Sequence, residues 1–532
     1  MDVSGPGWRR RDCLHALGAL SLAGGLVPGP ASAADPVAPA WTPLLARQAL
    51  ALLTAAGEHG LDPADYGVEA LARELPGALG GPPGQLALSG PVAALNNAFL
   101  RYLGHLAFGR VDPRQVHHRF SVAPRAGFDP AQALSAALAS GRLDDAVRAA
   151  LPPMPVYRQL QLALAALRAL GNHPAWAVGL PPLPVPRGAR AGKLEPGQPW
   201  AGLPLLAQRL ALLGDLPANL PVDSAVPDRL EGPLLAALQA FQQRHGLAAD
   251  GVLGPGTKAA LEVPPADRAR QVELGLERLR WTPLMHGPRM VVVNIPEYVL
   301  RAYEVIDGRI RLRLTMRVIV GKAMDHETPL FDERMRSIEF SPYWNVPPSI
   351  ARAETVPRLR RDPGHWDRQG FEFVAPDGSV DTVLSRNKLD AVLAGRLRIR
   401  QRPGPANALG DVKFVLPNQN HIFLHHTPSV GLFARERRDF SHGCIRVEDP
   451  VALARFVMDG MPGWDEARIR SQMALGTSTH VALQQPLPVV IAYGTVLVKD
   501  GRTHFFSDVY GHDARLQAAI DSLHNRPREI PR

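Results

Sequence analysis

The chain has 532 residues, which is too many for a single hydrophobic core and predicts two or three domains. Its content of 46% hydrophobic and 20% charged residues is that of a globular protein and excludes an intrinsically disordered chain. The 59 Lys and Arg against 50 Asp and Glu give a net charge of +9, but the sequence holds no dense basic run and no nucleic-acid-binding motif. We therefore expect no nucleic-acid partner.

The first residues follow the three-part pattern of an export signal. Arg9, Arg10 and Arg11 precede a short apolar run, and Ala31-Ser32-Ala33 forms a small-residue cleavage site. The apolar run is shorter than the ~20 residues needed to cross a bilayer. Residues 1–33 are therefore predicted to be a cleaved signal peptide that leaves no transmembrane anchor. The adjacent arginines fit both a twin-arginine signal and an ordinary secretory signal.

The chain contains two cysteines, Cys13 and Cys444. Cys13 would leave with the signal peptide, so Cys444 would be the single thiol of the mature protein. Exported proteins normally pair their cysteines in disulfides. A lone thiol there is either buried and inert or present for its reactivity.

The predicted mature chain begins with a helical scaffold domain over residues 40–215, which residues 264–286 complete. Thr42-Pro43 has the N-cap and first-turn proline of a helix start. A second helix is predicted from the apolar stripe of Leu95, Phe99, Leu103 and Leu106. The Pro- and Gly-rich stretch 173–204 is predicted to be a linker or an irregular loop.

Residues 216–263 predict a small unit of three helices. Leu234 to His245 has an amphipathic helical pattern, Asp250-Gly251 is a turn signal, and a second helix starts near Gly254. The segment LLAALQAFQQRHGLAADGVLGPGTKAAL resembles the peptidoglycan-binding repeat domain. The resemblance implies that this unit docks on glycan strands of the cell wall. The alternative is that it only packs against its neighbours.

Residues 287–510 change to the period of two that is typical of strands. Asp307-Gly308 and Asp500-Gly501 are hairpin signals. The predicted strands cover residues 290–295, 299–305, 310–320, 412–416 and 421–425, with a last hairpin over 488–506. Together with the helical first half, this pattern predicts a multidomain α+β protein whose β-rich domain comes last.

A long insertion interrupts the predicted strands between about residues 347 and 400. It has mixed helical and turn character, and insertions of this length in a compact sheet are usually functional. We interpret it as a lid beside the active site, which would shield a reactive intermediate from water. Residues 511–532 are predicted to form a C-terminal tail.

The strongest chemical signal lies between His421 and Pro450, where Cys444 follows His425 by 19 residues. Catalysis by cysteine needs a base for the thiol proton and donors for the oxyanion. A histidine at the end of one strand and a cysteine in a later loop can meet in space. Gly443 allows a tight turn, so that the amides of Gly443 and Cys444 would face the oxyanion. A helix predicted to start at Asp449-Pro450 would lower the pKa of the thiol.

Ser441-His442-Gly443-Cys444-Ile445-Arg446, with a histidine upstream at this spacing, matches the signature of the YkuD-type L,D-transpeptidases. Further segments resemble the large periplasmic members called YcbB-type, and the resemblance covers roughly residues 42–510. These segments are VIVGKAMDHETPLF, SPYWNVPPSIA, RPGPANALGDVKFVLPN and FLHHTPS.

The resemblance implies a role for each matching residue. Cys444 would be the acylated nucleophile and His425 the general base. His442 and Gly443 would line the oxyanion region, and Arg446 would fix the segment and bind a substrate carboxylate, with Ser441 beside the substrate. Some large members carry Ser at the position of His442, so this residue departs from their pattern, whereas His425 does not. His426 is left outside the catalytic set.

Three aromatic residues near the motif, Tyr343, Trp344 and Phe423, are candidates for the walls of a peptide cleft. Core packing is the alternative, above all for Phe423 on its strand. A zinc site is the alternative for the histidines and Cys444, but the spacing lacks paired cysteines. The family resemblance further implies that neither a metal nor an organic cofactor is required.

The family resemblance implies a reaction between two peptidoglycan tetrapeptide stems, one the donor and one the acceptor. The enzyme would release D-Ala, form a thioester and make a 3→3 cross-link, as a periplasmic monomer that carbapenems acylate. Two rivals remain open. One is a related cysteine enzyme, either an L,D-carboxypeptidase or a transferase that attaches a protein to the wall. The other is a wall-binding protein without catalysis.

Overall fold

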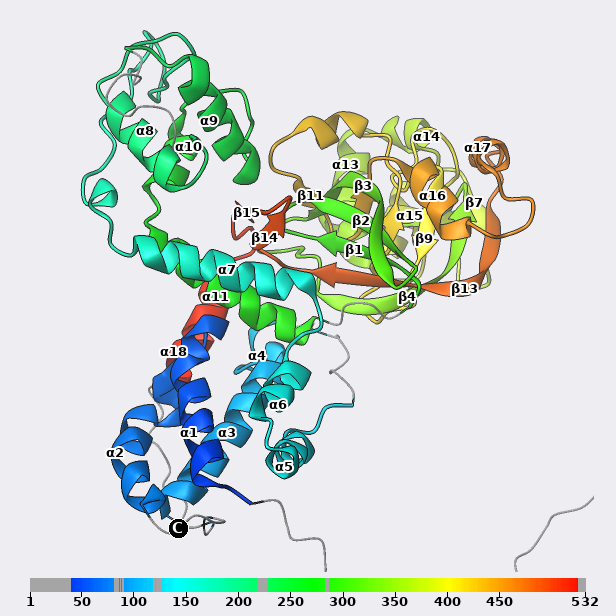
Figure 1. The fold of residues 1–532 in the computed structure, drawn as a ribbon. Helices are drawn as coiled ribbons and strands as arrows, with labels where there is room; N and C mark the ends of the chain where they lie inside the picture. The colour runs from blue at the N-terminus through cyan, green and yellow to red at the C-terminus, as the bar shows by residue number, and fades with distance from the viewer. Residues whose placement is uncertain are drawn as a thin grey trace, which may run out of the picture. The chain divides into compact units, whose positions relative to one another are not determined.

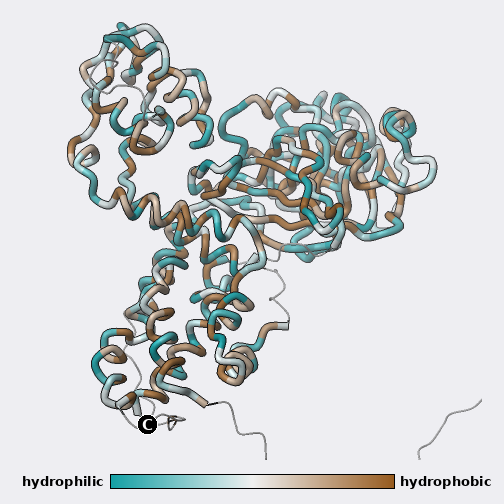
Figure 2. The backbone as a smooth tube through the Cα atoms, viewed as in Figure 1, coloured by the Kyte–Doolittle hydropathy of each residue, from teal (hydrophilic) through white to brown (hydrophobic). Residues whose placement is uncertain are grey.

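The structure is a computed structural model that describes residues 40–80, 86, 88, 90–117, 120, 127–217, 228–282 and 287–524. The predicted signal peptide with Cys13 lies outside the described residues. The predicted multidomain α+β class is confirmed, with helices through the first half and a β-rich second half (Figure 1). Figure 2 shows hydrophobic positions recurring along both kinds of element.

The N-terminal helices enclose one apolar core. Thr42 caps the first helix by accepting a hydrogen bond from the Leu45 amide at 3.3 Å, so the predicted helix start is confirmed. Leu95, Phe99 and Leu103 are fully buried in the core, as their helical spacing predicts. The elements are α1 (Pro43–Thr54), η1 (Ala55–His59), η2 (Pro63–Tyr66), α2 (Val68–Leu79), α3 (Gly90–Phe108), α4 (Pro113–Val116), α5 (Pro130–Ser140), α6 (Leu143–Ala150) and α7 (Pro155–Leu170).

Helix α11 (Pro265–Trp281) packs along α7 and carries a buried ion network. Glu277 and Arg280 have fully buried side chains and pair at 2.6 Å, and Arg280 also donates to the hydroxyl of Tyr157 at 3.0 Å. Arg110 adds a second cation to Glu277 at 3.4 Å. A charge buried this completely depends on its partners, so the network ties α11 to the N-terminal helices.

The small helical unit contains α8 (Leu203–Leu212), α9 (Gly232–Arg244) and α10 (Pro255–Glu262), preceded by the short turn η3 (Pro174–Trp176). Its core joins Leu206 and Leu210 of α8 to Leu238 and Phe241 of α9. The unit therefore includes residues before the expected start at 216, because α8 buries its apolar face here.

The main sheet of the second half has nine strands in the order β11-β3-β12-β10-β9-β4-β13-β1-β2. β2 also pairs with β3, so the sheet closes around a core that α16 and α17 cover (Figure 1). The strands are β1 (Arg289–Asn294), β2 (Val299–Ile306), β3 (Arg309–Gly321), β4 (Phe331–Phe340), β9 (Val412–Val415), β10 (Leu424–His425), β11 (Asp439–Ser441), β12 (Ile445–Val447) and β13 (Thr479–Ala492). The helices are η5 (Val430–Ala434), α16 (Pro450–Met458) and α17 (Glu466–Ala474).

The strand predicted over residues 421–425 is shorter than expected and covers only Leu424 and His425. Asn418 explains the difference, because its side chain bonds the carbonyl and the amide of Ile422 at 2.6 and 3.0 Å and holds a loop there. His421 has a φ of 53°, which is incompatible with a strand.

The insertion interpreted as a lid folds around its own core. Its strands form a separate sheet in the order β5-β8-β6-β7, and Trp366 and Phe373 are buried beneath it. The elements are β5 (Trp344–Asn345), α12 (Pro348–Ile350), η4 (Ala351–Thr355), α13 (Val356–Arg361), α14 (His365–Gln369), β6 (Phe371–Val374), β7 (Val380–Asp381), α15 (Arg386–Leu393) and β8 (Arg398–Gln401).

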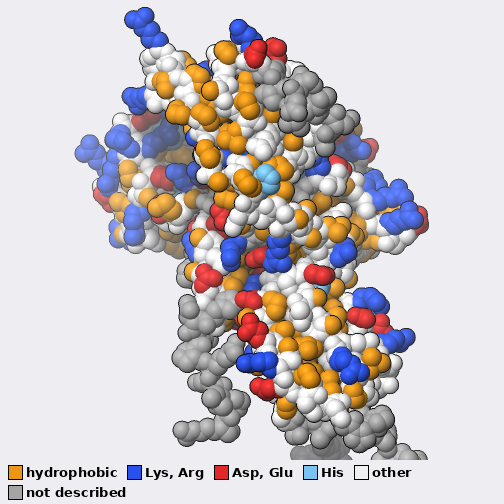
Figure 3. Space-filling model, turned by 60° about the vertical axis from the view of Figure 1, so that its left-hand side comes forward, with side chains coloured by type: hydrophobic (Ala, Val, Ile, Leu, Met, Phe, Trp, Pro, Cys, Tyr) orange, Lys and Arg blue, Asp and Glu red, His pale blue; other side chains and the backbone are white. Residues whose placement is uncertain are grey.

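A hairpin and a helix follow the main sheet, and the helix lies where a tail was predicted. The hairpin β14 (Val496–Lys499) and β15 (Arg502–Phe505) turns at Asp500-Gly501, as predicted. It is followed by α18 (His512–His524), which buries Leu516 and Ile520 against Trp281. On the face in Figure 3, Lys and Arg side chains stand at several separate places.

Candidate functional site

The register of β10 and β12 sets out the candidate catalytic face. The two strands are parallel, with Leu424 opposite Ile445, and both of these side chains are fully buried in the core. Side chains alternate between the faces of a strand, so the flanking residues point to the other face. That face carries Phe423, His425, Cys444 and Arg446. The motif histidine and cysteine, separated by 19 residues in the sequence, are thereby brought to adjacent strands.

His425 is held in the tautomer that a general base needs. Its Nδ1 lies 2.5 Å from the carbonyl oxygen of His426. A carbonyl can only accept a hydrogen bond, so in the neutral ring Nδ1 carries the proton and Nε2 is the acceptor nitrogen. The imidazole is 4% exposed, and burial, followed by the charge of Arg446, lowers the pKa of His425 to about 3. The ring is therefore neutral around pH 7.

The Cys444 thiol is also neutral. It donates to the carbonyl of His421 at 3.8 Å, and among the interactions of the described residues no hydrogen bond joins it to His425. Burial raises the pKa of Cys444 to about 11, against the opposing effects of the Phe423 amide and the cations Lys413 and Arg446. Cys444 lies two residues before Arg446, the register partner of His425, so the thiol and the imidazole are diagonal neighbours on one face of the sheet.

The expected lowering of the thiol pKa by the following helix is wrong. Helix α16 does begin at Pro450, as predicted, but the three residues of β12 stand between it and the thiol. The side chain of Asp449 already accepts from the Ala452 amide at 2.9 Å, so the helix N-terminus is capped by its own carboxylate. Desolvation dominates at Cys444 instead.

Ser441 and Gly443 shape the turn before Cys444. Ser441 is 2% exposed, its hydroxyl donates to the Cys444 carbonyl at 2.5 Å, and it accepts from the Gly443 amide at 3.1 Å. Ser441 was expected to lie beside the substrate. It does not face a substrate in this structure, because both of its bonds are made within the turn. The Gly443 amide does not point to an oxyanion in this structure for the same reason. Gly443 has a φ of 112°, which favours glycine.

His442 and Arg446 differ in what surrounds them. The Nε2 atom of His442 lies 2.6 Å from a carboxylate oxygen of Glu354 in the lid, and its ring centre is 4.6 Å from that of His326. Arg446 is opposite His425 in the register and is half-buried. Among the ion pairs of the described residues, no carboxylate partners Arg446, which leaves its guanidinium available to an anionic group.

The three aromatic candidates separate into two groups. The Phe423 ring centre is 5.8 Å from that of His425 and 4.5 Å from the Lys413 ammonium, so Phe423 lies on the catalytic face and not in the core. Trp344 packs against the lid core. The Tyr343 ring lies 4.1 Å beneath the guanidinium of an arginine on β8, so it too is tied to the lid sheet.

Sequence reasoning missed Lys413 and Glu354. Lys413 of β9 is opposite His425 in the register, and its ammonium lies 3.3 Å from Glu339. The alternation in GDVKFVLPN places Lys413 on one face of a strand, but only the strand order brings that face to His425. Glu354 is placed by the fold of the lid, for which the sequence carried no comparable signal.

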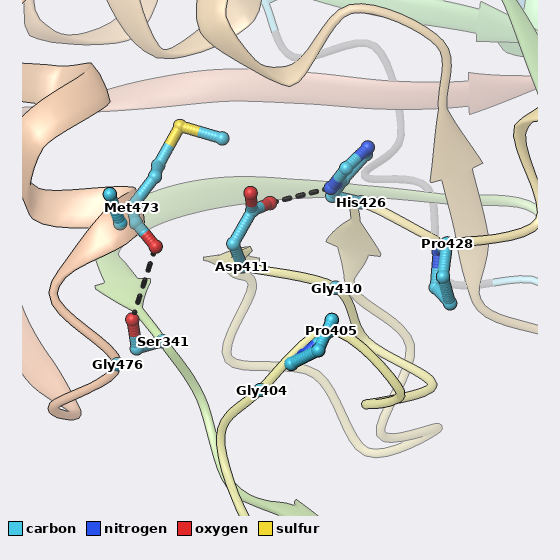
Figure 4. A pocket seen from close by; sticks show the side chains of 10 residues that line it. Ser341, Gly404, Pro405, Gly410, Asp411, His426, Pro428, Met473 and Gly476 are labelled. Atoms are coloured by element: carbon cyan, nitrogen blue, oxygen red, sulfur yellow. Dashed lines mark hydrogen bonds and ion pairs between the residues drawn. The ribbon is translucent and has the colours of Figure 1, made fainter.

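A cavity of about 330 Å³ lies at the end of β10 (Figure 4). His426 borders it and is paired with Asp411 at 2.5 Å, and Ser341 donates to the carbonyl of Met473 at 3.4 Å. The remaining lining residues are Gly404, Pro405, Gly410, Pro428, Ala474 and Gly476. The side chain of His426 thus bonds a carboxylate, whereas that of its neighbour His425 bonds a backbone carbonyl.

The described residues include neither a metal-binding cluster nor a membrane-spanning helix. No three His, Cys, Asp or Glu side chains gather there in a cluster that could hold a metal ion. No helix in that part of the chain is long and apolar enough to span a membrane.

Comparison with family models divides the chain into three matched parts. Residues 288–469 match the L,D-transpeptidase catalytic domain, YkuD, and residues 34–164 match a scaffold domain. Residues 204–261 match the model described as "Putative peptidoglycan binding domain". The last match starts near α8, in agreement with the core of the small unit.

A curated protein of Haemophilus influenzae named "Putative L,D-transpeptidase" is 31% identical over 250 residues, which are 47% of this chain and 49% of that protein. The match therefore spans about half of the relative's length. Solved L,D-transpeptidases from Stackebrandtia nassauensis and Xylanimonas cellulosilytica are 14% and 16% identical over 57% and 59% of this chain and 93% and 98% of theirs. Their TM-scores of 0.22 and 0.18 are too low to support any argument.

Proposed function

Because the chain carries a YkuD-type L,D-transpeptidase catalytic domain beside scaffold and peptidoglycan-binding domains, we propose that it joins peptidoglycan stem peptides by 3→3 cross-links through a thioester on Cys444. The observation that carries the proposal is the contact between Nδ1 of His425 and the carbonyl oxygen of His426, which sets the tautomer of the ring. Its Nδ1 is committed to a backbone carbonyl, so its Nε2 can accept the thiol proton on the face that Cys444 shares.

In the acylation step, Cys444 sulfur attacks the carbonyl carbon of the third residue of a donor tetrapeptide, while His425 Nε2 takes the thiol proton. The C–N bond to D-Ala then breaks, and the same proton passes from His425 to the departing amine. The products are free D-Ala and a thioester on Cys444. Arg446, for which the described residues offer no carboxylate partner, would bind the donor's terminal carboxylate.

In the transfer step, the side-chain amine of an acceptor stem's third residue attacks the thioester carbonyl. His425 takes a proton from this amine and returns it to the sulfur as the C–S bond breaks. The products are an amide between two third residues and the regenerated thiol, so no oxidant, metal or cofactor takes part. Water in place of the amine would give a trimmed stem, which is the L,D-carboxypeptidase alternative.

The setting of the reaction is part of the same proposal. Residues 216–263, together with α8, would hold glycan strands of the wall while the catalytic domain acts on their stems. Residues 1–33 would direct a monomeric protein to the periplasm. Carbapenems would acylate Cys444 by the same attack on a carbonyl.

Mass spectrometry of the protein incubated with a disaccharide-tetrapeptide tests the proposal. We expect an acyl adduct on the Cys444 peptide, release of D-Ala and growth of a 3→3 dimer. Cys444→Ala and His425→Ala should abolish all three signals. His426→Ala is the matched control, since this neighbouring histidine bonds Asp411 and should leave the adduct intact. A trimmed monomer without a dimer would refute cross-linking, and turnover by Cys444→Ala would refute the thioester.

A further inference from the structure

One contact joins the lid to the catalytic motif itself. Glu354 lies on η4 of the lid, and its carboxylate oxygen is 2.6 Å from Nε2 of His442, two residues before Cys444. The side chains are 55% and 33% exposed, so the pair stands at the surface of the site and not in a core. A carboxylate can only accept a hydrogen bond when ionised, which makes His442 the donor.

The turn that carries His442 is firmly held on its other side. Thr328 donates to the Gly443 carbonyl at 2.7 Å and accepts from the Gly321 amide at 2.9 Å. A Cβ on Gly321 would lie 3.0 Å from the Cα of Gly443 and 1.9 Å from the carbonyl oxygen of His326, so these segments touch directly. The ring of His326, in the same loop as Thr328, is tilted by 54° against that of His442. The backbone beside His442 is therefore held in place, so that a group bound to His442 is tied to the catalytic motif.

The lid, by contrast, is a body with its own sheet and core, so it can be held or released as a unit. Within η4, Ala351 and Thr355 are buried in the lid, and Glu354 is on the exposed side. A π-helical turn is rare and recurs at functional sites, because the extra residue re-aims a side chain. Here the side chain that leaves the lid reaches the motif.

We propose that Glu354 is a positioning residue that latches the lid onto His442 and thereby controls access to Cys444. The lid stays over the thiol while the Glu354–His442 bond is made, and large reagents reach Cys444 only after it breaks. Under the proposed function, on which this consequence rests, the latch lowers the share of the thioester that water hydrolyses.

The latch is tested by comparing two thiol reagents of different size on the Cys444 peptide, with no wall substrate present. The ratio of the rate with fluorescein maleimide to the rate with iodoacetamide reports access and cancels changes in thiol ionisation. An ion pair of this exposure is expected to shift the ratio by about two- to fivefold. We expect this rise in Glu354→Ala and a smaller rise in Glu354→Gln, which keeps an acceptor.

Asp367→Ala is the matched control, because Asp367 is an exposed acid of the lid on α14 that should leave the ratio unchanged. Since Glu354 acts through His442, Glu354→Ala should add nothing in a His442→Ala background. An unchanged ratio in Glu354→Ala, or a further rise in the double variant, would overturn the proposal. The alkylation needs no peptidoglycan, so a failure of the proposed cross-linking would not affect it.

Discussion

The alkylation rate of Cys444 should reach its maximum at a much higher pH than that of an ordinary thiol. Burial raises its pKa from 9.0 to about 11. Each pH unit below the pKa reduces the thiolate tenfold, so at pH 8 about one molecule in a thousand would hold a thiolate, against about one in ten for an unshifted thiol. The structure therefore predicts alkylation that is about a hundredfold slower at pH 8.

The assay is the rate of iodoacetamide addition between pH 7 and pH 11, followed by mass spectrometry on the peptide that contains Cys444. The logarithm of the rate should rise by about one for each pH unit until pH ~10. Glutathione treated in parallel gives the reference for an exposed thiol. His425→Ala should leave the midpoint nearly unchanged, since the pKa of His425, about 3, leaves its ring neutral throughout this range.

A plateau reached by pH 8 would refute the reasoning. It would mean that Cys444 and His425 already form a thiolate–imidazolium pair in the free protein, as in many cysteine enzymes. A large upward shift of the midpoint in His425→Ala would refute it for the same reason, because only a charged His425 could hold the midpoint down.

Three further results are expected. Lys413→Met should raise the pKa of Cys444 and slow its alkylation at pH 9, whereas Lys413→Arg should not, because the cation opposes the effect of burial. Glu277→Gln should lower the free energy of unfolding in urea by ~3–5 kcal/mol, since it leaves buried Arg280 without its counter-ion; a loss below ~1 kcal/mol would contradict this. Burial lowers the pKa of His117 to about 3 and of His512 to about 2. Their contribution to stability is complete above pH ~6.5 and is lost as the pH falls toward 3, so the melting temperature should drop on acidification, and less so in His117→Leu.

The parts of the fold that depend on neighbouring residues could be predicted from the sequence. Asp307-Gly308 and Asp500-Gly501 turn their hairpins with positive φ at both residues, as the Asp-Gly signal requires. Period-two alternation located β1, β2, β3 and β9, but it predicted no strand at β4, β11 or β12. The strand predicted to begin at His421 is absent there for a local reason too. The side chain of Asn418 bonds the chain at Ile422, and an alternating pattern of residues does not reveal such a bond.

The order of the strands could not be predicted, and the environment of the site depends on it. Lys413 faces His425 because β9 and β10 are neighbours, and the lid brings Glu354 to His442. The pKa of Cys444 is a further example. Helix position alone predicted a lowered value, but desolvation belongs to the assembled site and has the opposite sign.

A nucleophile that rests in its neutral form would suit the exported enzyme that we propose, in which Cys444 is the single thiol left after signal cleavage. The thiolate is the form of cysteine that oxidants attack, so a Cys444 ionised at all times would be exposed to oxidation in the periplasm that we propose for this protein. The raised pKa of the half-buried thiol avoids this, but it requires that ionisation and attack on the substrate occur in the same step. That step needs a base whose acceptor nitrogen is ready in advance, and the bond from His425 Nδ1 to the His426 carbonyl provides it. Under the proposed mechanism, the raised pKa of the thiol and the tautomer of His425 are therefore two parts of one arrangement, in which the substrate's arrival would start the proton transfer.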